Sequence, residues 1–197
     1  DALHYNGIFE IIIVVGHLKE KFYDLVQNYE GIVLVENPYY NSCNNISSLY
    51  VVRDYIEDVI ILDGDQIIYN KKILNPEFEK SGYCATWKEE TLEWLLTVNN
   101  DKIVSCNRNG GKLGYQLFSV SFWNKDDGAK LKEHLEKEFN VNKNRDIYWD
   151  DVAMFCYPDK YELGIREINE EDLLEIDNLD ELVMVDESYS KYIENGV

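Results

Sequence analysis

The chain has 197 residues, the length of one ordinary domain, and 45% of them are hydrophobic, which is enough to build a full core and excludes intrinsic disorder. Its 38 acidic residues outnumber its 19 basic residues and give a formal net charge of −19. A surface of this charge repels phosphate backbones and anionic lipid headgroups. We therefore expect neither a nucleic-acid partner nor insertion into a membrane.

The sequence also bears on the cellular compartment. The longest apolar run, residues 11–15, is too short to span a bilayer, and no signal-peptide pattern is visible. The cysteines are widely spaced and form no C-x-x-C motif; they are Cys43, Cys84, Cys106 and Cys156. This spacing predicts reduced thiols in a cytoplasmic protein and argues against a disulfide framework or a zinc site.

The first third of the chain alternates between strand and helix patterns. Residues 1–6 are typical of a helix end that Gly7 closes, and residues 11–15 are a continuous β-branched run, typical of a strand buried on both faces. The elements that follow are predicted helices at 18–29 and 46–55 and predicted strands at 32–35 and 59–62. This alternation predicts a mostly parallel sheet with helices on both sides and ligands beyond the carboxyl ends of its strands.

The remainder of the chain is richer in strands. Turn sequences at 99–101 and 109–111 indicate hairpins between neighbouring strands. The predicted strands are 82–87, 94–98, 102–106, 115–120 and 161–165, and the predicted helices are 123–139, 151–156 and 179–192. We therefore predict a single α/β domain with a β-hairpin excursion.

Two acidic clusters are candidates for a metal site. Asp63 and Asp65 follow the predicted strand 59–62, and Glu175 and Asp177 lie far along the chain. If the fold brings the clusters together, their carboxylates suit Mg²⁺, which takes oxygen ligands together with substrate phosphates. In a chain this acidic, each cluster taken alone is more typical of an ordinary solvated turn.

A third group mixes aromatic side chains with carboxylates. Glu93 is followed by Trp94, and Tyr148, Trp149 and Asp150 are consecutive. Aromatic faces attract organic cations, and a nearby carboxylate adds coulombic attraction, so this group is a candidate pocket for an amine. The alternative is that the rings belong to the core.

Asn45 and Ser48 lie at the start of the predicted helix 46–55. Asn and Ser are ordinary helix N-caps, but polar groups at a strand-to-helix junction also bind bases and phosphates. The sequence leaves both interpretations open.

Several of these motifs occur together in a familiar order. They are residues 11–22 (IIIVVGHLKEKF), 44–50 (NNISSLY), 62–65 (LDGD), 93–94 (EW), 148–150 (YWD) and 175–177 (EID). In this order the chain resembles the sugar-phosphate-type nucleotidyltransferase superfamily, and more narrowly the bacterial CTP:phosphocholine cytidylyltransferases and their relatives that act on phosphoethanolamine or aminoethylphosphonate. The resemblance implies a three-layer α/β/α Rossmann-like fold with a mixed, mostly parallel sheet and a β-hairpin excursion.

The resemblance also implies roles for individual residues. Asp65 would be the principal, catalytic Mg²⁺ ligand, with Glu175 and Asp177 completing the metal site. The nucleotide would lie near Asn45, Ser48 and Asp63. The cationic acceptor would be held by Trp94, Tyr148 and Asp150, with Glu93 and Trp149 beside them.

The implied reaction is Mg²⁺-dependent transfer of a cytidylyl group from CTP to a small, phosphocholine-like amino-alcohol phosphate. A sugar phosphate as the acceptor, or a non-catalytic nucleotide-binding or regulatory domain of the same fold, are the alternatives. The family normally opens with a strand and a Gly-rich loop bearing Arg and Lys, and neither is found within residues 1–197. We expect these residues to form a nucleotidyltransferase domain without that strand and loop, and we do not expect it to turn over by itself.

Overall fold

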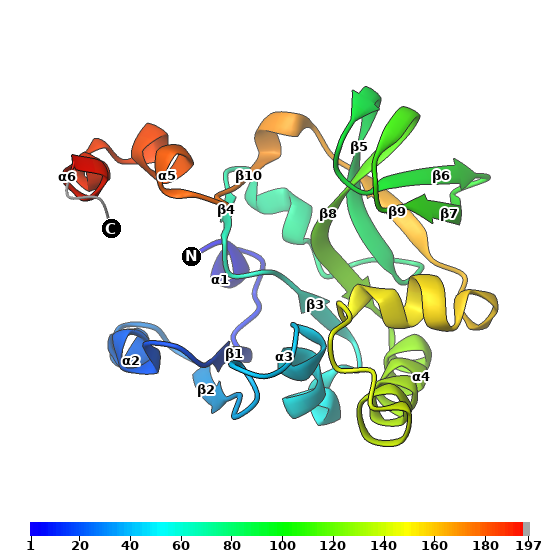
Figure 1. Cartoon of the computed structure of the whole chain (residues 1–197), viewed down its shortest axis with the longest axis horizontal. Helices are drawn as coiled ribbons and strands as arrows, with labels where there is room; N and C mark the ends of the chain where they lie inside the picture. Colours follow the sequence, from blue (N-terminus) through cyan, green and yellow to red (C-terminus); the bar gives the residue numbers. More distant parts are fainter. Residues whose placement is uncertain (195–197) are drawn as a thin grey trace.

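The computed structural model describes residues 1–194 (Figure 1). The α-helices are α1 (Ala2–Tyr5), α2 (Tyr23–Asn28), α3 (Ile46–Val51), α4 (Lys125–Glu136), α5 (Leu179–Val185) and α6 (Ser190–Glu194). The strands are β1 (Ile11–Val15), β2 (Ile32–Glu36), β3 (Val59–Ile61), β4 (Gln66–Ile68), β5 (Gly82–Thr91), β6 (Leu95–Asn99), β7 (Lys102–Asn107), β8 (Gly111–Trp123), β9 (Gly164–Glu167) and β10 (Leu173–Glu175). The last three residues of the predicted domain lie outside the described part.

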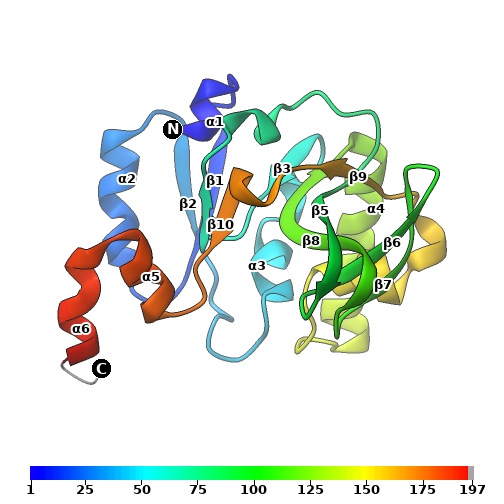
Figure 2. The same ribbon diagram turned by 90° about the horizontal axis from the view of Figure 1, so that it is seen from above.

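The strands form a six-stranded sheet and two strand pairs. The large sheet has the order β7-β6-β8-β5-β9, with β3 pairing with β8, while β1 pairs with β2 and β10 with β4. Figure 2 shows the β1–β2 pair beside the larger sheet. The α/β class and the mixed sheet are thus confirmed, but the prediction of mostly parallel strands is wrong. Only β1–β2 and β5–β9 are parallel among the described strand pairs, because short turns join β5, β6, β7 and β8 and allow antiparallel pairing alone.

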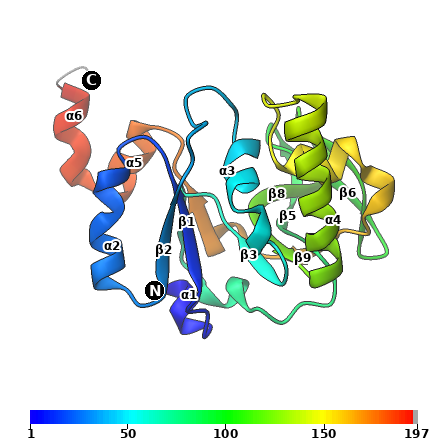
Figure 3. The same ribbon diagram turned by 90° about the horizontal axis from the view of Figure 1, so that it is seen from below.

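The large sheet separates two clusters of buried side chains. Helices α3 and α4 cover one side of it (Figure 3). Tyr83 and Ala85 of β5 point into that cluster, whereas Cys84 between them points into the second one. Successive side chains of a strand alternate between its faces, so β5 supplies both clusters.

The strand β1 is less buried than its apolar sequence predicts. Only Val15 is fully buried, and the other four residues are partly exposed. Within residues 1–194, β1 is hydrogen-bonded to β2 alone, which leaves its other edge unpaired. The prediction of a strand buried on both faces is therefore wrong for this part of the chain.

The helices are shorter than predicted. The predicted helix 18–29 begins with a 3₁₀ turn, and the helix 123–139 continues after α4 as a π-helical segment. The predicted helix 179–192 is interrupted at Asp186, where the backbone is extended. The Asp186 side chain caps the next turn, because its Oδ1 accepts a hydrogen bond from Ser188 N at 2.9 Å. No helix in the described part of the chain is long and apolar enough to cross a bilayer.

Gly128 of α4 marks a close contact between that helix and the segment before β3. A Cβ atom at this position would lie 1.8 Å from the carbonyl oxygen of Ile56. Gly→Ala inside a helix normally stabilises it by about 1 kcal/mol, but here the backbone clash dominates. We expect Gly128→Ala to lower the free energy of unfolding by roughly 3 kcal/mol, as overpacked sites do. Urea unfolding tests this, with exposed Ala129→Gly in the same helix as the control, for which propensity alone predicts a loss of about 1 kcal/mol. Equal or greater stability of Gly128→Ala would contradict the contact.

Candidate active site

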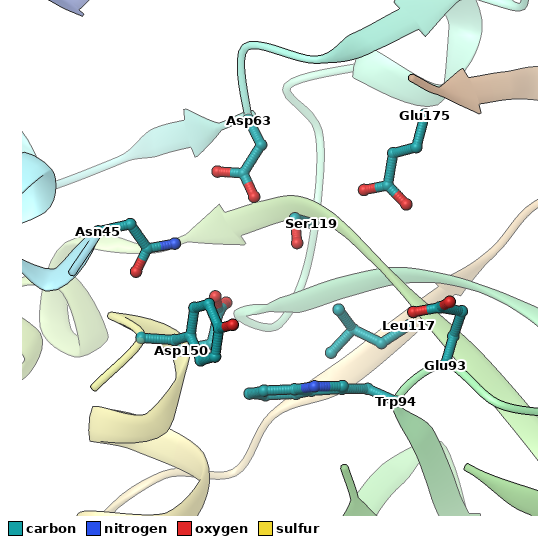
Figure 4. Close-up of a pocket in the computed structure, with 9 residues that line it drawn as sticks. Asn45, Asp63, Glu93, Trp94, Leu117, Ser119, Asp150 and Glu175 are labelled. Atoms are coloured by element: carbon teal, nitrogen blue, oxygen red, sulfur yellow. The ribbon is translucent and has the colours of Figure 1, made fainter. Parts of the chain in front are cut away.

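A pocket of about 190 Å³ opens where the end of β3, the middle of β8 and the segment before α3 meet (Figure 4). Its lining residues are Asn45, Asp63, Glu93, Trp94, Leu117, Ser119, Tyr148, Asp150 and Glu175. Figure 4 shows the indole of Trp94 on one side of the pocket and the carboxylates of Asp63 and Glu175 on the opposite side. The pocket therefore has an aromatic end and an acidic end.

The acidic end is built by a strand pair that we did not predict. Glu175 of β10 pairs in register with Gln66 of β4, and Gln66 Nε2 donates to Glu175 Oε1 at 3.0 Å. Next to this pair, just after β10 ends and just before β4 begins, Ile176 N donates to the carbonyl oxygen of Asp65 at 3.0 Å. The two acidic clusters predicted from distant segments are thus brought together by β4 and β10.

These carboxylates repel one another. Burial, followed by the charge of Asp65, raises the pKa of Asp63, and the neighbouring Ser119 hydroxyl partly offsets the rise. Burial also raises the pKa of Glu175, to which the charges of Asp65, Asp177 and Asp63 add, against the hydrogen bond from Gln66. A bound cation at this end would relieve the repulsion.

The aromatic end consists of two rings from different elements. Trp94 directly precedes β6, and its carbonyl oxygen accepts a hydrogen bond from Leu117 N of β8 at 2.9 Å. Its indole meets the ring of Tyr148 edge to face, with the centroids 5.8 Å apart at an interplanar angle of 86°. Glu93 lines the pocket next to Trp94. The two rings and the carboxylate together present a surface that suits an organic cation.

Asp150 is the most unusual residue of the pocket. It is only 5% exposed, and its Oδ1 has no hydrogen-bond partner within the described residues. The hydroxyl of Tyr83, which also has no partner of hydrogen-bond geometry among the described residues, lies beside it and favours its ionised form, which lowers the pKa. Burial, together with the charge of Asp63, raises the pKa of Asp150 to about 8. An unsatisfied buried carboxyl oxygen is costly, so a ligand that supplies a positive charge or a donor there binds favourably.

Four predicted site residues lie outside the pocket lining. Trp149 is 3% exposed and packs in the core against Tyr83 and Trp123, so its ring is not available to a substrate. Asp65 and Asp177 are exposed beside Glu175. Ser48 accepts a hydrogen bond from Asn37 Nδ2 at 3.2 Å.

Asn45 lines the pocket and does not act as a helix cap. It occupies the N-cap position of α3 without a capping hydrogen bond. Its Oδ1 instead accepts from Trp149 N at 2.9 Å, which ties the start of α3 to the segment that carries Tyr148 and Asp150. The N-cap interpretation of Asn45 is therefore wrong, and its contact with a base or phosphate stays a prediction.

Sequence reasoning missed Leu117 and Ser119 of β8. They line the pocket, while Phe118 between them packs in the second buried cluster. Ser119 is polar within a largely apolar strand, and residues two apart share one face of a strand. A Ser in that position is the signal that could have indicated that Ser119 and Leu117 face a pocket.

The acidic end suits Mg²⁺, although residues 1–194 contain no group of three acid, His or Cys side chains arranged to hold a metal. Mg²⁺ keeps several waters and usually takes only one or two protein carboxylates together with substrate phosphates. None of the ion pairs found in the described part of the chain neutralises Asp63, Asp65, Glu175 or Asp177. The donor chemistry therefore fits a metal ion that arrives with its phosphate ligand.

Comparisons with known proteins identify relatives of this chain. No protein-family model matches the chain. The chain is 30% identical over 193 residues to a 2-aminoethylphosphonate cytidylyltransferase of Lancefieldella rimae, covering 96% of this chain and 78% of that protein. It is 30% identical over 188 residues to a choline-phosphate cytidylyltransferase of Streptococcus pneumoniae, covering 95% and 81% respectively.

Solved structures show the same fold. The CTP:phosphocholine cytidylyltransferase of Streptococcus pneumoniae superimposes with a TM-score of 0.86 at 28% identity, over 95% of this chain and 81% of that one. The inositol-1-phosphate CTP transferase of T. maritima superimposes with a TM-score of 0.70 at 22% identity, over 100% and 81%. The predicted nucleotidyltransferase fold is confirmed, and the chain belongs to the cytidylyltransferase family of nucleotidyltransferases.

Proposed function

We propose that this protein transfers a cytidylyl group from CTP to the phosphate or phosphonate of a small compound that carries a cationic amine. The observation that carries the proposal is the unpartnered Oδ1 of buried Asp150, which lines the same pocket as Trp94 and Tyr148. The family relationship supplies the nucleotide chemistry, and this oxygen supplies the argument for the acceptor.

The aromatic end binds the amine in this proposal. Trp94 and Tyr148 offer ring faces and edges, and Glu93 offers negative charge. Asp150 would release its proton when a cation binds beside it, because an opposite charge favours the ionised carboxylate. A buried carboxylate gains most from a cation that is desolvated with it, since the effective dielectric constant there is low. A neutral sugar has no charge to supply and would need hydrogen-bonding groups where the two rings lie.

The acidic end faces the phosphates. Asp65, Glu175 and Asp177 would hold Mg²⁺, with Asp63 and Asn45 toward the nucleotide. When bound, the metal would neutralise charge on the phosphate oxygens. The dependence on Mg²⁺ and the site of the metal are part of the proposal.

The chemical step needs no nucleophile from the protein. An oxygen of the acceptor phosphate attacks the α-phosphorus of CTP, the new P–O bond forms, the bond to the β-phosphate oxygen breaks and pyrophosphate leaves. Positioning the two substrates in line and neutralising charge account for catalysis of such a transfer. The side chains of the pocket hold and orient the two reactants.

Titration calorimetry of the full protein tests this proposal. We expect CDP-choline or CDP-ethanolamine to bind more tightly than CDP in the presence of Mg²⁺. Trp94→Ala should weaken binding of the CDP-amine by about 1–2 kcal/mol, roughly 5- to 30-fold, as loss of a cation–π contact does, and leave the affinity for CDP unchanged. Trp87→Ala is the matched control, because Trp87 is 49% exposed, packs on Tyr115 and does not line the pocket.

Three results would contradict the proposal. CDP-glucose binding as tightly as the CDP-amines would favour a sugar phosphate as the acceptor. Equal effects of Trp94→Ala and Trp87→Ala would remove the aromatic end from the acceptor site. Binding of nucleotides without any turnover of CTP by the full protein would favour a binding or regulatory domain.

A further inference from the structure

Arg108 lies behind the aromatic end of the pocket. It directly follows β7, and Trp94 directly precedes β6. The ladder between these strands pairs Leu95 with Asn107, so Trp94 and Arg108 occupy the next position along the same hairpin. Arg108 does not line the pocket, whereas Trp94 does.

The guanidinium group of Arg108 stacks on two aromatic rings. Its central carbon lies 5.5 Å from the ring centroid of Trp94 and 4.1 Å from that of Phe155. Phe155 in turn meets Trp94 edge to face, with the centroids 5.7 Å apart. The indole is therefore supported by a planar cation and by a second ring at once.

The same guanidinium pairs with a buried acid. Arg108 donates to Asp151 Oδ1 at 2.5 Å, and the Asp151 side chain is only 2% exposed. The other carboxylate oxygen of Asp151 accepts from Tyr148 N at 3.0 Å. Burial raises the pKa of Asp151, and the charge of Arg108 opposes the rise. Asp151 thus joins Arg108 to the backbone of the second aromatic residue of the pocket.

These contacts close a ring of four residues, from Trp94 through Arg108 and Asp151 to Tyr148 and back across the edge contact between the two aromatic side chains. We propose that Arg108 is a positioning residue that holds Trp94 and Tyr148 at the separation needed to bind the amine of the acceptor. The inference rests on the proposed function. Arg108 also neutralises the charge of Asp151. The amine of the acceptor can therefore pair with the neighbouring Asp150.

Substitutions of Arg108 test this role by comparing the affinity for a CDP-amine with the affinity for CDP. In the full protein, Arg108→Met should weaken binding of the preferred CDP-amine about 10-fold and leave the affinity for CDP unchanged. Arg108→Lys should restore little of the loss, since an ammonium group cannot stack as a planar guanidinium does. Lys112→Met on the neighbouring strand β8 is the control, because the ion pair that Lys112 makes among the described residues is an exposed one with Glu90.

A double variant separates positioning from charge compensation. Arg108→Met leaves Asp151 buried without a cation, and adding Asp151→Asn removes that charge. We expect the double variant to regain thermal stability but not affinity for the CDP-amine. Full recovery of the affinity, or an equal loss of affinity for CDP and the CDP-amine in Arg108→Met, would overturn the inference.

A ligand-free measurement keeps this test independent of the proposed function. In an NMR spectrum, the indole N–H signal of Trp94 is assigned by its loss in Trp94→Phe. We expect its chemical shift to change in Arg108→Met and to stay the same in Lys112→Met. An unchanged signal in Arg108→Met would overturn the inference even if amines bind. If the wild-type protein binds CDP-amines no more tightly than CDP, the proposed function fails, and this signal alone decides whether Arg108 positions Trp94.

Discussion

Asp150→Asn is expected to make the protein more stable while it weakens binding of the cationic acceptor. The wild-type carboxyl group is buried, and its Oδ1 has no partner among the described residues. An amide of the same shape cannot ionise and so avoids the cost of a buried negative charge. We therefore expect a gain of roughly 2 kcal/mol in the free energy of unfolding near pH 7.5, the size seen when a destabilising functional side chain is replaced. Loss of the carboxylate should cost about 2–3 kcal/mol of binding to a CDP-amine, roughly 30- to 150-fold.

The pH dependence of stability identifies Asp150 as the cause. Its pKa is about 8 in the folded protein, above the ordinary value of 3.8 that applies in the unfolded chain. Between these values the unfolded state has released the proton that the folded state retains, so the contribution of Asp150 to stability falls as the pH rises from about 4 to 8. The gain from Asp150→Asn should therefore grow across this range and level off above it.

Urea unfolding at several pH values measures this difference. Asp159→Asn is the matched control, because Asp159 is exposed, and its curve should run parallel to that of the wild-type protein. A constant difference between Asp150→Asn and wild type from pH 4 to 8 would contradict the assignment. Lower stability of the variant above pH 7 would do the same.

The fold was predictable where the apolar pattern was strong and local. The pattern that predicts the helix 46–55 places Leu49, Val52 and Ile56 on one face, and all three are buried. Strand direction was not predictable in the same way, because it depends on which segments meet. β3 pairs with β8 about 60 residues further along the chain, and no local pattern encodes that partner. The three-residue strands β4 and β10 were missed since so short a run carries no visible period.

The candidate site was predictable in its chemistry and less so in its geometry. Residue types alone indicated an acidic group and an aromatic group, and the structure places members of both around one pocket. They could not show that Trp149 turns into the core while its neighbours Tyr148 and Asp150 line the pocket. That outcome depends on the backbone of residues 148–152. Asp151 fixes it locally by accepting from Tyr148 N, and the distant residues Arg108 and Asn45 hold it through hydrogen bonds with Asp151 and Trp149 N.

Asp65→Ala is expected to abolish Mg²⁺-dependent turnover of the full protein, with a loss of about 10³-fold. Asp65 is the main protein ligand in the proposed Mg²⁺ site, and without the bound ion the negative charge on the transferring phosphates would not be neutralised. The fold should survive the substitution. Asp65 is exposed, and the contact that joins it to β10 uses its backbone carbonyl oxygen, which accepts from Ile176 N and is retained by Ala. The urea midpoint of Asp65→Ala should therefore equal that of the wild-type protein.

Initial rates across a series of Mg²⁺ concentrations separate a metal role from a general loss. Asp65→Ala should need far more Mg²⁺ for any remaining activity, whereas Asp159→Ala, at an exposed acid away from the pocket lining, should follow the wild-type curve. Glu175→Gln should share the defect more weakly, since Glu175 already shares its Oε1 with Gln66. Wild-type rates in Asp65→Ala would reject the metal assignment. A loss confined to Glu175→Gln would move the metal toward Asp63, the other carboxylate at the acidic end of the pocket.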